Sequence, residues 1–269
     1  MSVSYEGKTA LITGGSSGIG LEFARIFARR GASLVLVARS EDRLRAAASA
    51  LEEEYGVSVR TIPANLSEKG SVSRVVSGVE ELGLEVSLLV NNAGSGYYGR
   101  FSEGPEPEEV WDGLSLNVTV SAALTRAFLP GMIRRREGAV VNLSSTAAFQ
   151  PVPYMATYGA SKAFMLSFSE ALWAECRGTG VKVLAVCPGA VETEFWADWG
   201  GRDPRRYNLL TGISNPGQVA EAGVHALDSG KGTVIPGLRD RLVARSIPLA
   251  PRSFVARASE KLNRLKRGR

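Results

Sequence analysis

The chain has 269 residues, of which 44% are hydrophobic, enough for one large globular domain with a substantial core. Its net charge is +5, but residues 239–269 alone carry a balance of +8, which leaves −3 for residues 1–238. The basic character therefore belongs to the C-terminal end and does not indicate a nucleic-acid partner.

Cysteine usage and hydropathy suggest where the protein works. Two cysteines, Cys176 and Cys187, are too few for a disulfide framework, and both fall inside apolar stretches, so we expect buried thiols in a reducing compartment. No apolar run approaches the roughly 18 residues that span a bilayer, and residues 1–8 lack the pattern of a signal peptide. We therefore expect a cytoplasmic protein. No cluster of Cys, His and Asp has metal-ligand spacing, so no metal site is expected.

A strand, a glycine-rich turn and a helix follow one another near the start of the chain. The strand is expected over residues 9–12, and the turn over residues 13–20 leads into a mainly apolar helix that ends near Gly31. Glycines let the backbone approach a pyrophosphate, and a helix N-terminus offers free N–H groups. This order predicts a dinucleotide site, whose contacts we place at Gly14, Ser16, Ser17, Gly18, Ile19 and Gly20.

The second strand, expected over residues 33–38, bears on the choice of cofactor. It ends in Ala38-Arg39-Ser40. An acidic residue at this end would bind the ribose 2′-OH of NAD, whereas an arginine favours the 2′-phosphate of NADP. Arg39 therefore predicts NADP(H) in preference to NAD(H). The alternative is that Arg39 is a solvated surface residue.

Strands and helices alternate through the rest of the chain. Strands are expected over residues 57–62, 85–90, 138–143, 181–187 and 232–235, and helices over 41–55, 106–136, about 155–177 and 217–228. Parallel strands need such crossovers, so the sequence predicts a doubly wound α/β (Rossmann) fold. We expect a mostly parallel sheet of about seven strands with helices on both faces. A single catalytic domain would occupy residues 1–238, followed by a basic, partly helical extension over 239–269.

Tyr158 and Lys162 stand four residues apart, on one face of an expected helix. A free phenol has a pKa of about 10 and is a poor proton shuttle at neutral pH. A neighbouring ammonium favours the phenolate and brings that pKa towards the working range. The pair is therefore a candidate acid/base device, although the same spacing also occurs by chance on surface helices.

Together these motifs resemble the classical short-chain dehydrogenase/reductase family. They occur in the order of the family and cover roughly residues 5–195: Thr13 to Gly20, Asn91-Asn92-Ala93-Gly94, Asn117, Ser145, Tyr158 to Lys162, and Pro188-Gly189. Ser145 precedes Tyr158 by 13 positions, the usual spacing of the family, and so matches better than Ser144. Leu129-Pro130-Gly131-Met132 and Pro151-Val152-Pro153 add a weaker resemblance to the branch of steroid and long-chain 3-ketoacyl reductases.

The resemblance implies a role for each of these residues. Tyr158 would donate a proton to a substrate carbonyl oxygen, and Lys162 would lower the pKa of Tyr158 and hydrogen-bond the nicotinamide ribose. Ser145 would hold the carbonyl oxygen, and Asn117 would position a water that relays protons. Further cofactor contacts are implied at Asn65, Leu66, Asn92, Ala93, Gly94, Pro188, Gly189, Val191 and Thr193. Asn65 departs from the family, which commonly has Asp at that position.

The implied activity is an NADP(H)-dependent oxidoreductase. Hydride would pass between the nicotinamide and a carbonyl or secondary alcohol of an apolar substrate, such as a ketone, a steroid-like molecule or a 3-ketoacyl thioester. A substrate wall is expected at Ser145, Tyr98, Phe149, Tyr154, Phe195 and Trp196, with a lid over about residues 192–214. Several of these aromatic residues can instead pack in the core or at a subunit contact. The alternatives are an NAD-linked alcohol dehydrogenase and a non-catalytic NADP-sensing protein. A homodimer or homotetramer is implied by the family alone.

The C-terminal segment has apolar residues at helical spacing among basic ones. Phe254, Val255, Ala258, Leu262 and Leu265 alternate with six arginines and lysines: Arg252, Arg257, Lys261, Arg264, Lys266 and Arg267. A basic amphipathic helix can lie on an anionic membrane surface, so peripheral membrane contact is one expectation. It can equally cover the substrate cleft, contact another subunit or remain a solvated end.

Overall fold

The computed structural model of the chain describes residues 5–195 and 213–264. Within these residues, a seven-stranded sheet has the order β3-β2-β1-β4-β5-β6-β9, and all of its neighbouring strands are parallel. The strands are β1 (Thr9–Thr13), β2 (Ser33–Ala38), β3 (Val59–Pro63), β4 (Val86–Asn91), β5 (Gly138–Leu143), β6 (Val181–Val186) and β9 (Thr233–Val234). The predicted doubly wound parallel sheet of about seven strands is therefore confirmed.

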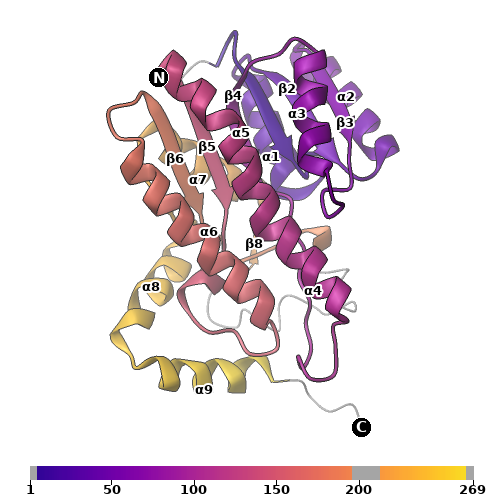
Figure 1. Cartoon of the computed structure of the whole chain (residues 1–269). Helices are drawn as coiled ribbons and strands as arrows, with labels where there is room; N and C mark the ends of the chain where they lie inside the picture. Colours follow the sequence, from indigo (N-terminus) through magenta and orange to yellow (C-terminus); the bar gives the residue numbers. More distant parts are fainter. Residues whose placement is uncertain (1–4, 196–212, 265–269) are drawn as a thin grey trace.

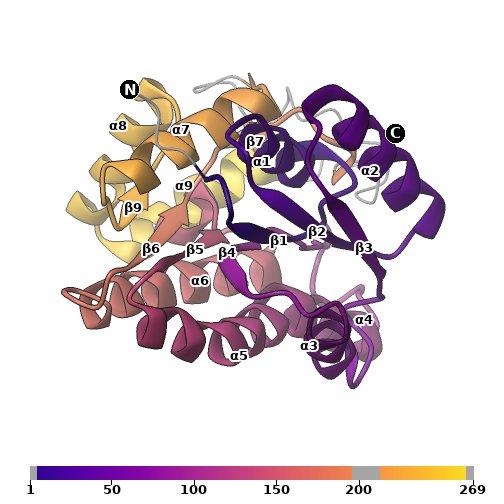
Figure 2. The same ribbon diagram turned by 90° about the horizontal axis from the view of Figure 1, so that it is seen from above.

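Helices cover both faces of the sheet (Figure 2). One face carries α1 (Gly18–Arg29), α2 (Glu41–Tyr55) and α7 (Pro216–Asp228), and the other carries α3 (Ser71–Glu81), α5 (Val120–Arg135) and α6 (Ala156–Glu175). Because side chains alternate along a strand, Ala10 and Ile12 of β1 enter the first core while Leu11 enters the second. Burial on both faces explains why these strands are continuous apolar runs in the sequence.

The helical region expected over residues 106–136 is divided by a π-helical turn. It comprises α4 (Pro107–Leu114), the π turn Ser115–Thr119 and α5, and the turn contains Asn117. By length and composition the run Pro107–Arg135 also qualifies as a membrane span, contrary to the expectation from the sequence. Length and composition are weak evidence for a membrane span, because the apolar core helices of soluble proteins meet the same criteria. Here α5 packs on β4 and β5.

A buried polar network joins the sheet to α5 and α6. Asn142 of β5 donates through Nδ2 to Ser169 Oγ of α6 at 2.9 Å, and its Oδ1 accepts from Asn91 Nδ2 of β4 at 2.8 Å. Asn91 Nδ2 also lies 3.0 Å from Thr125 Oγ1 of α5. Because buried polar groups lose free energy when left unpaired, these bonds fix the positions of both helices on the sheet. The two cysteines are free and buried, as expected.

The last part of the chain leaves the sheet and crosses one end of the molecule. After α7 and β9 come α8 (Leu238–Ser246), a 3-10 turn (Ile247–Leu249) and α9 (Arg252–Asn263). Figure 1 shows α9 at the end of the molecule towards which β5 and β6 point. The short parallel strands β7 (Ala190–Val191) and β8 (Ile213–Ser214) pair with each other. Residues 196–212, with Trp196 and most of the expected lid, lie outside the described residues.

Candidate active site

The strand order places a cleft at the carboxyl ends of the strands. The chain winds from β1 outwards to β3 and then returns to β4 on the other side of β1, so the two directions of winding diverge between β1 and β4. Ligands bind at such a switch point in open α/β sheets. A cleft of about 1120 Å³ lies there, and its walls come from the segments that follow β1, β2, β3, β4, β5 and β6.

Two glycines determine the shape of the turn after β1. Gly14 has a φ of +65°, and a Cβ there would lie 2.7 Å from Asn92 Nδ2. A Cβ at Gly20 would overlap the carbonyl oxygen of Gly14, so Gly20 lets α1 approach the turn closely. Gly20 does not line the cleft. Its predicted cofactor contact is therefore corrected to a packing role, because its missing side chain faces the turn.

The start of α1 fits a pyrophosphate. Ser17 is its N-cap, and within the described structure the Ser17 side chain makes no capping hydrogen bond, which leaves first-turn N–H groups for a ligand. The other predicted contacts of this turn all line the cleft with it: Gly14, Ser16, Gly18 and Ile19. The residues present therefore fit the cofactor that the motif predicts.

Two arginines mark the other end of this part of the cleft. Arg39 lines it directly after β2, and Arg43 of α2 lines it four residues further on. Arg43 Nη2 pairs with Glu194 Oε2 at 2.5 Å. Arg43 was not predicted from the sequence, although its spacing from Arg39 at the start of a helix was an available signal. Asn65 and Leu66 line the same region, as predicted.

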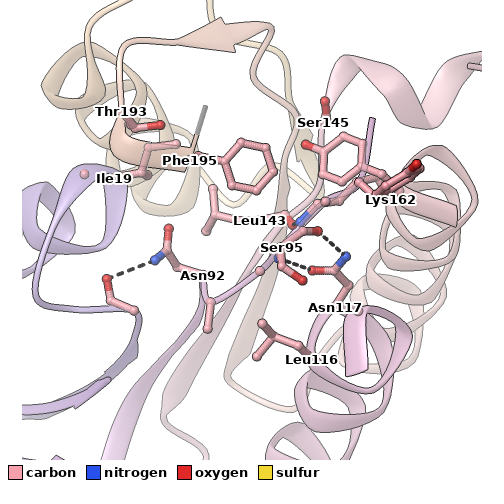
Figure 3. A pocket seen from close by; sticks show the side chains of 18 of the residues that line it. Ile19, Asn92, Ser95, Leu116, Asn117, Leu143, Ser145, Lys162, Thr193 and Phe195 are labelled. Atoms are coloured by element: carbon pink, nitrogen blue, oxygen red, sulfur yellow. Dashed lines mark hydrogen bonds between the residues drawn. The ribbon is translucent and has the colours of Figure 1, made fainter. Parts of the chain in front are cut away.

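Asn92 joins the ends of β1 and β4. Its Nδ2 donates to Gly14 O at 3.2 Å (Figure 3) and also to Thr13 O at 2.9 Å. In return, Thr13 Oγ1 accepts from the backbone N–H groups of Asn92 and Ala93, both at 3.0 Å. Asn92, Ala93 and Gly94 line the cleft as predicted, and so do Pro188, Gly189, Val191 and Thr193.

The π turn directs Asn117 into the region between β4 and α6. Asn117 Oδ1 accepts from Ser95 N at 3.0 Å, and its Nδ2 donates to Ser95 O at 2.8 Å (Figure 3). The same Nδ2 also donates to Ser161 Oγ at 3.2 Å. A Cβ at Gly94 would lie 2.8 Å from Asn117 Oδ1, so glycine is required beside it. Ser95 and Ser161 were not predicted as site residues: Ser95 follows the motif that ends at Gly94, and Ser161 lies within the motif Tyr158 to Lys162 but had no role assigned.

Lys162 lies in the second turn of α6, and Ser145 lies just after β5. Lys162 is buried, and its Nζ donates to Leu143 O, the last residue of β5, at 2.9 Å. Burial lowers the pKa of Lys162 to about 8. Ser145 caps the 3-10 turn Thr146–Phe149 by accepting from Ala147 N at 3.1 Å, and its Oγ also lies 3.3 Å from Pro188 O. Ser145 therefore has a structural role and also faces the cleft.

Burial of the phenol has the largest effect on the pKa of Tyr158. Burial raises the pKa of Tyr158 to about 12, and a hydrogen bond with Ser145 opposes this shift less strongly. Lys162 Nζ lies 5.6 Å from the centre of the Tyr158 ring and donates to Leu143 O. Desolvation of the phenol is the largest cause of this shift, and the lowering of the pKa of Tyr158 by Lys162 stays a prediction. Burial likewise raises the pKa of Cys187, so this neighbouring thiol stays neutral.

Only some residues of the predicted substrate wall line the cleft. Phe195 lines the cleft, and its ring centre lies 5.7 Å from that of Tyr158. Tyr98 and Tyr154 do not line the cleft but pack in the apolar cluster around Met155 and Tyr158. Phe149 is a correction: it packs in a separate cluster with core residues of α6 and α8. The cleft wall includes three residues that were not predicted: Gln150, Val152 and Met155.

The C-terminal segment is bonded to this wall. Tyr154 Oη donates to Glu260 Oε1 of α9 at 3.0 Å, and Tyr98 Oη donates to Asn263 O. Asn263 itself lines the cleft. On the cofactor side, a Cβ at Gly189 would lie 2.6 Å from Asp240 Oδ1 of α8. Of the alternatives for this segment, covering the cleft is the one that these contacts support.

Comparison with known proteins agrees with this site. Residues 8–203 match the family model described as short chain dehydrogenase. A short chain dehydrogenase of Pseudocercospora fijiensis is 43% identical over 194 residues, which cover 71% of this chain and 62% of that protein. A very-long-chain 3-oxoacyl-CoA reductase of Anas platyrhynchos is 37% identical over 193 residues, which cover 70% and 61%. The chain thus spans about three fifths of the length of these relatives.

A solved structure gives the same result over nearly the whole chain. The short-chain dehydrogenase from Sphingobium yanoikuyae in complex with NADPH superimposes with a TM-score of 0.80 at 34% identity and covers 97% of this chain and 98% of its own. The chain therefore belongs to the short-chain dehydrogenase/reductase family, whose members are oxidoreductases. The weaker resemblance to the steroid and ketoacyl reductase branch is also confirmed.

The buried Lys162 gives a prediction for stability against pH. Its folded pKa of about 8 lies below the ordinary 10.5, so the unfolded chain binds more protons between these values. This contribution to stability is complete above the unfolded pKa and is lost as the pH falls through the folded one. Between about pH 8 and 9, the free energy of unfolding of the wild type should rise by roughly 1 kcal/mol relative to Lys162→Met. Urea unfolding of both proteins measures this difference, and a difference that is independent of pH would contradict it.

Proposed function

We propose that the protein is an NADP(H)-dependent carbonyl reductase that acts, in the reverse direction, as a secondary-alcohol dehydrogenase. The observation that carries this proposal is the convergence of Asn117, Ser145, Tyr158 and Lys162 on one cleft. The other part of that cleft is the uncapped start of α1, and Figure 3 shows Ile19 and Thr193 on that side of Phe195, opposite Ser145 and Lys162. A protein that only sensed the nucleotide would not need all four of these side chains.

The side chains fit the transfer of one proton to a carbonyl oxygen. With a pKa of about 12, Tyr158 is protonated at neutral pH and is therefore available as a donor. The bound cofactor supplies the hydride to the carbonyl carbon. After the proton has left, Lys162 stabilises the phenolate from 5.6 Å above its ring. Burial and Lys162 thus act at different stages of the reaction. Burial keeps Tyr158 protonated before the transfer, and Lys162 lowers the free energy of the phenolate afterwards.

Two features support NADP(H) over NAD(H). Arg39 and Arg43 both line the cleft where the second ribose of a dinucleotide would lie, after β2. A guanidinium can bind a 2′-phosphate through two parallel hydrogen bonds. Arg39 also stands directly after β2, at the position where an NAD site has an acidic residue. An NAD-linked alcohol dehydrogenase remains the second candidate.

An apolar substrate fits the wall beside Tyr158. Val152, Met155 and Phe195 line the cleft, and Tyr98 and Tyr154 support them from behind. The likeness to a very-long-chain 3-oxoacyl-CoA reductase favours a 3-ketoacyl thioester within the class of apolar ketones. We also propose a cytoplasmic homodimer or homotetramer, on the resemblance of the family alone.

Tyr158→Phe removes the proton donor and keeps the ring. Reduction of an apolar ketone should fall by about 10²-fold or more, because proton transfer by a positioned group contributes about that much. NADPH binding, followed by fluorescence, should stay within a few-fold and acts as the control for folding. Reduction that survives within a few-fold would exclude Tyr158 as the donor.

Arg39→Asp should reverse the cofactor preference. The carboxylate repels a 2′-phosphate and can accept a hydrogen bond from a ribose 2′-OH. The ratio of the dissociation constants of NADPH and NADH should rise by at least about tenfold. Lys69→Asp, at an exposed residue outside the cleft lining, has the same charge change and should leave the ratio unaltered. An unchanged ratio in Arg39→Asp would contradict the 2′-phosphate site.

Glu260→Ala tests the contact between α9 and the substrate wall. Loss of the acceptor for Tyr154 should raise the KM for an apolar ketone several-fold, because a hydrogen bond of this kind, here partly buried, contributes about 1 kcal/mol. The dissociation constant of NADPH should not change, since Glu260 lies outside the cofactor part of the cleft. Glu260→Gln keeps an acceptor and should restore KM, and Arg257→Ala on the exposed side of α9 is the control. Equal effects on KM and on NADPH binding would show that α9 serves only stability.

A further inference from the structure

Large apolar side chains gather on the exposed side of α8, the 3-10 turn and α9. Five of them are between 58% and 87% exposed, and we call this set the outer face: Leu238, Leu242, Leu249, Phe254 and Leu262. Single exposed apolar residues are ordinary on a soluble protein. Five within one short segment are a concentration, and such concentrations mark interaction surfaces.

Cations accompany the outer face. Six exposed arginines and lysines belong to the same elements: Arg239, Arg241, Arg245, Arg252, Arg257 and Lys261. Within residues 5–195 and 213–264, Arg245, Arg257 and Lys261 form no ion pair. Of the two acidic residues of the segment, Asp240 is buried, and Glu260 bonds to Tyr154 and pairs with Arg264. The exposed surface is therefore both apolar and strongly positive.

The two sides of α9 differ. Val255 and Ser259 are buried, and Glu260 bonds to Tyr154, so this side of α9 packs against the rest of the protein. Phe254 and Lys261 occupy the opposite side at helical spacing. Figure 1 shows α9 at one end of the molecule, with the sheet and the other helices on its inner side. A flat surface can therefore approach the outer side without displacing a neighbouring element of the described chain.

We propose that the outer face docks on a lipid bilayer with anionic headgroups. The apolar side chains would enter the boundary between headgroups and acyl chains, and the cations would contact lipid phosphates. A second copy of the chain is the poorer occupant, because two such positive surfaces repel each other. Docking is independent of the proposed reaction, but it would place the substrate end of the cleft, which Asn263 lines, beside the lipid.

Flotation of the full chain with vesicles tests this surface. The wild type should float with vesicles of phosphatidylcholine and phosphatidylglycerol and far less with phosphatidylcholine alone. Arg257→Glu with Lys261→Glu should lower the partition coefficient by at least about tenfold, since each cation contributes about 1 kcal/mol at an anionic surface. Lys69→Glu with Lys231→Glu changes the charge equally at exposed positions elsewhere and should bind as the wild type does.

A second variant separates docking from misfolding. Leu242→Ser with Phe254→Ser keeps every charge, and it should also lose flotation while it retains the circular dichroism and the melting temperature of the wild type. A wild type that stays unbound with anionic vesicles overturns the proposal. Variants that float normally but turn a dimer into a monomer in sedimentation overturn it too, and would show that the outer face is a subunit contact.

Discussion

The hydrogen bonds between Asn92 and the end of β1 are the constraint on which the site depends. Thr13 and Asn92 are 79 residues apart in the chain, yet four hydrogen bonds join Thr13 and Gly14 to Asn92 and Ala93. They hold the glycine turn, and with it the start of α1, at a fixed position relative to β4. Asn117 is fixed to the next residues of the same segment through Ser95. The cofactor part and the catalytic part of the cleft are thus positioned by one stretch of chain.

Desolvation has the largest effect on the pKa values of the buried groups around the predicted catalytic residues. The phenol of Tyr158, the amine of Lys162 and the thiol of Cys187 all shift towards their neutral forms, because a medium of low dielectric disfavours charge. A tyrosine with a raised pKa stays protonated until a substrate binds. The same burial raises the free energy of the phenolate that Tyr158 becomes after it has lost the proton. The nearby amine of Lys162, in its charged form, then lowers that free energy. Burial and the Lys162 cation therefore both contribute to proton donation by Tyr158.

Much of this could be predicted from the sequence, and the exceptions have a common cause. The strands of the sheet, the glycine turn and the four catalytic residues follow from local patterns that depend on neighbours in the chain. The role of Gly20 and the position of Phe149 were predicted wrongly, because packing across elements decides them. Glu260 and Asn263 were missed because their partners lie more than 100 residues away in the sequence. The burial of Tyr158 could not be predicted, since spacing along a helix shows proximity but not burial.

The attachment of α9 to the substrate wall has a consequence for how this enzyme can change. Its bonds reach Tyr98 and Tyr154, which do not line the cleft themselves, and it contributes Asn263 at the edge. None of the four catalytic side chains bonds to it in the described residues. The sequence and length of α9 can therefore change while Tyr158, Lys162 and the glycine turn after β1 are kept. Under the proposed function, substrate selectivity can therefore change while the predicted catalytic residues are kept.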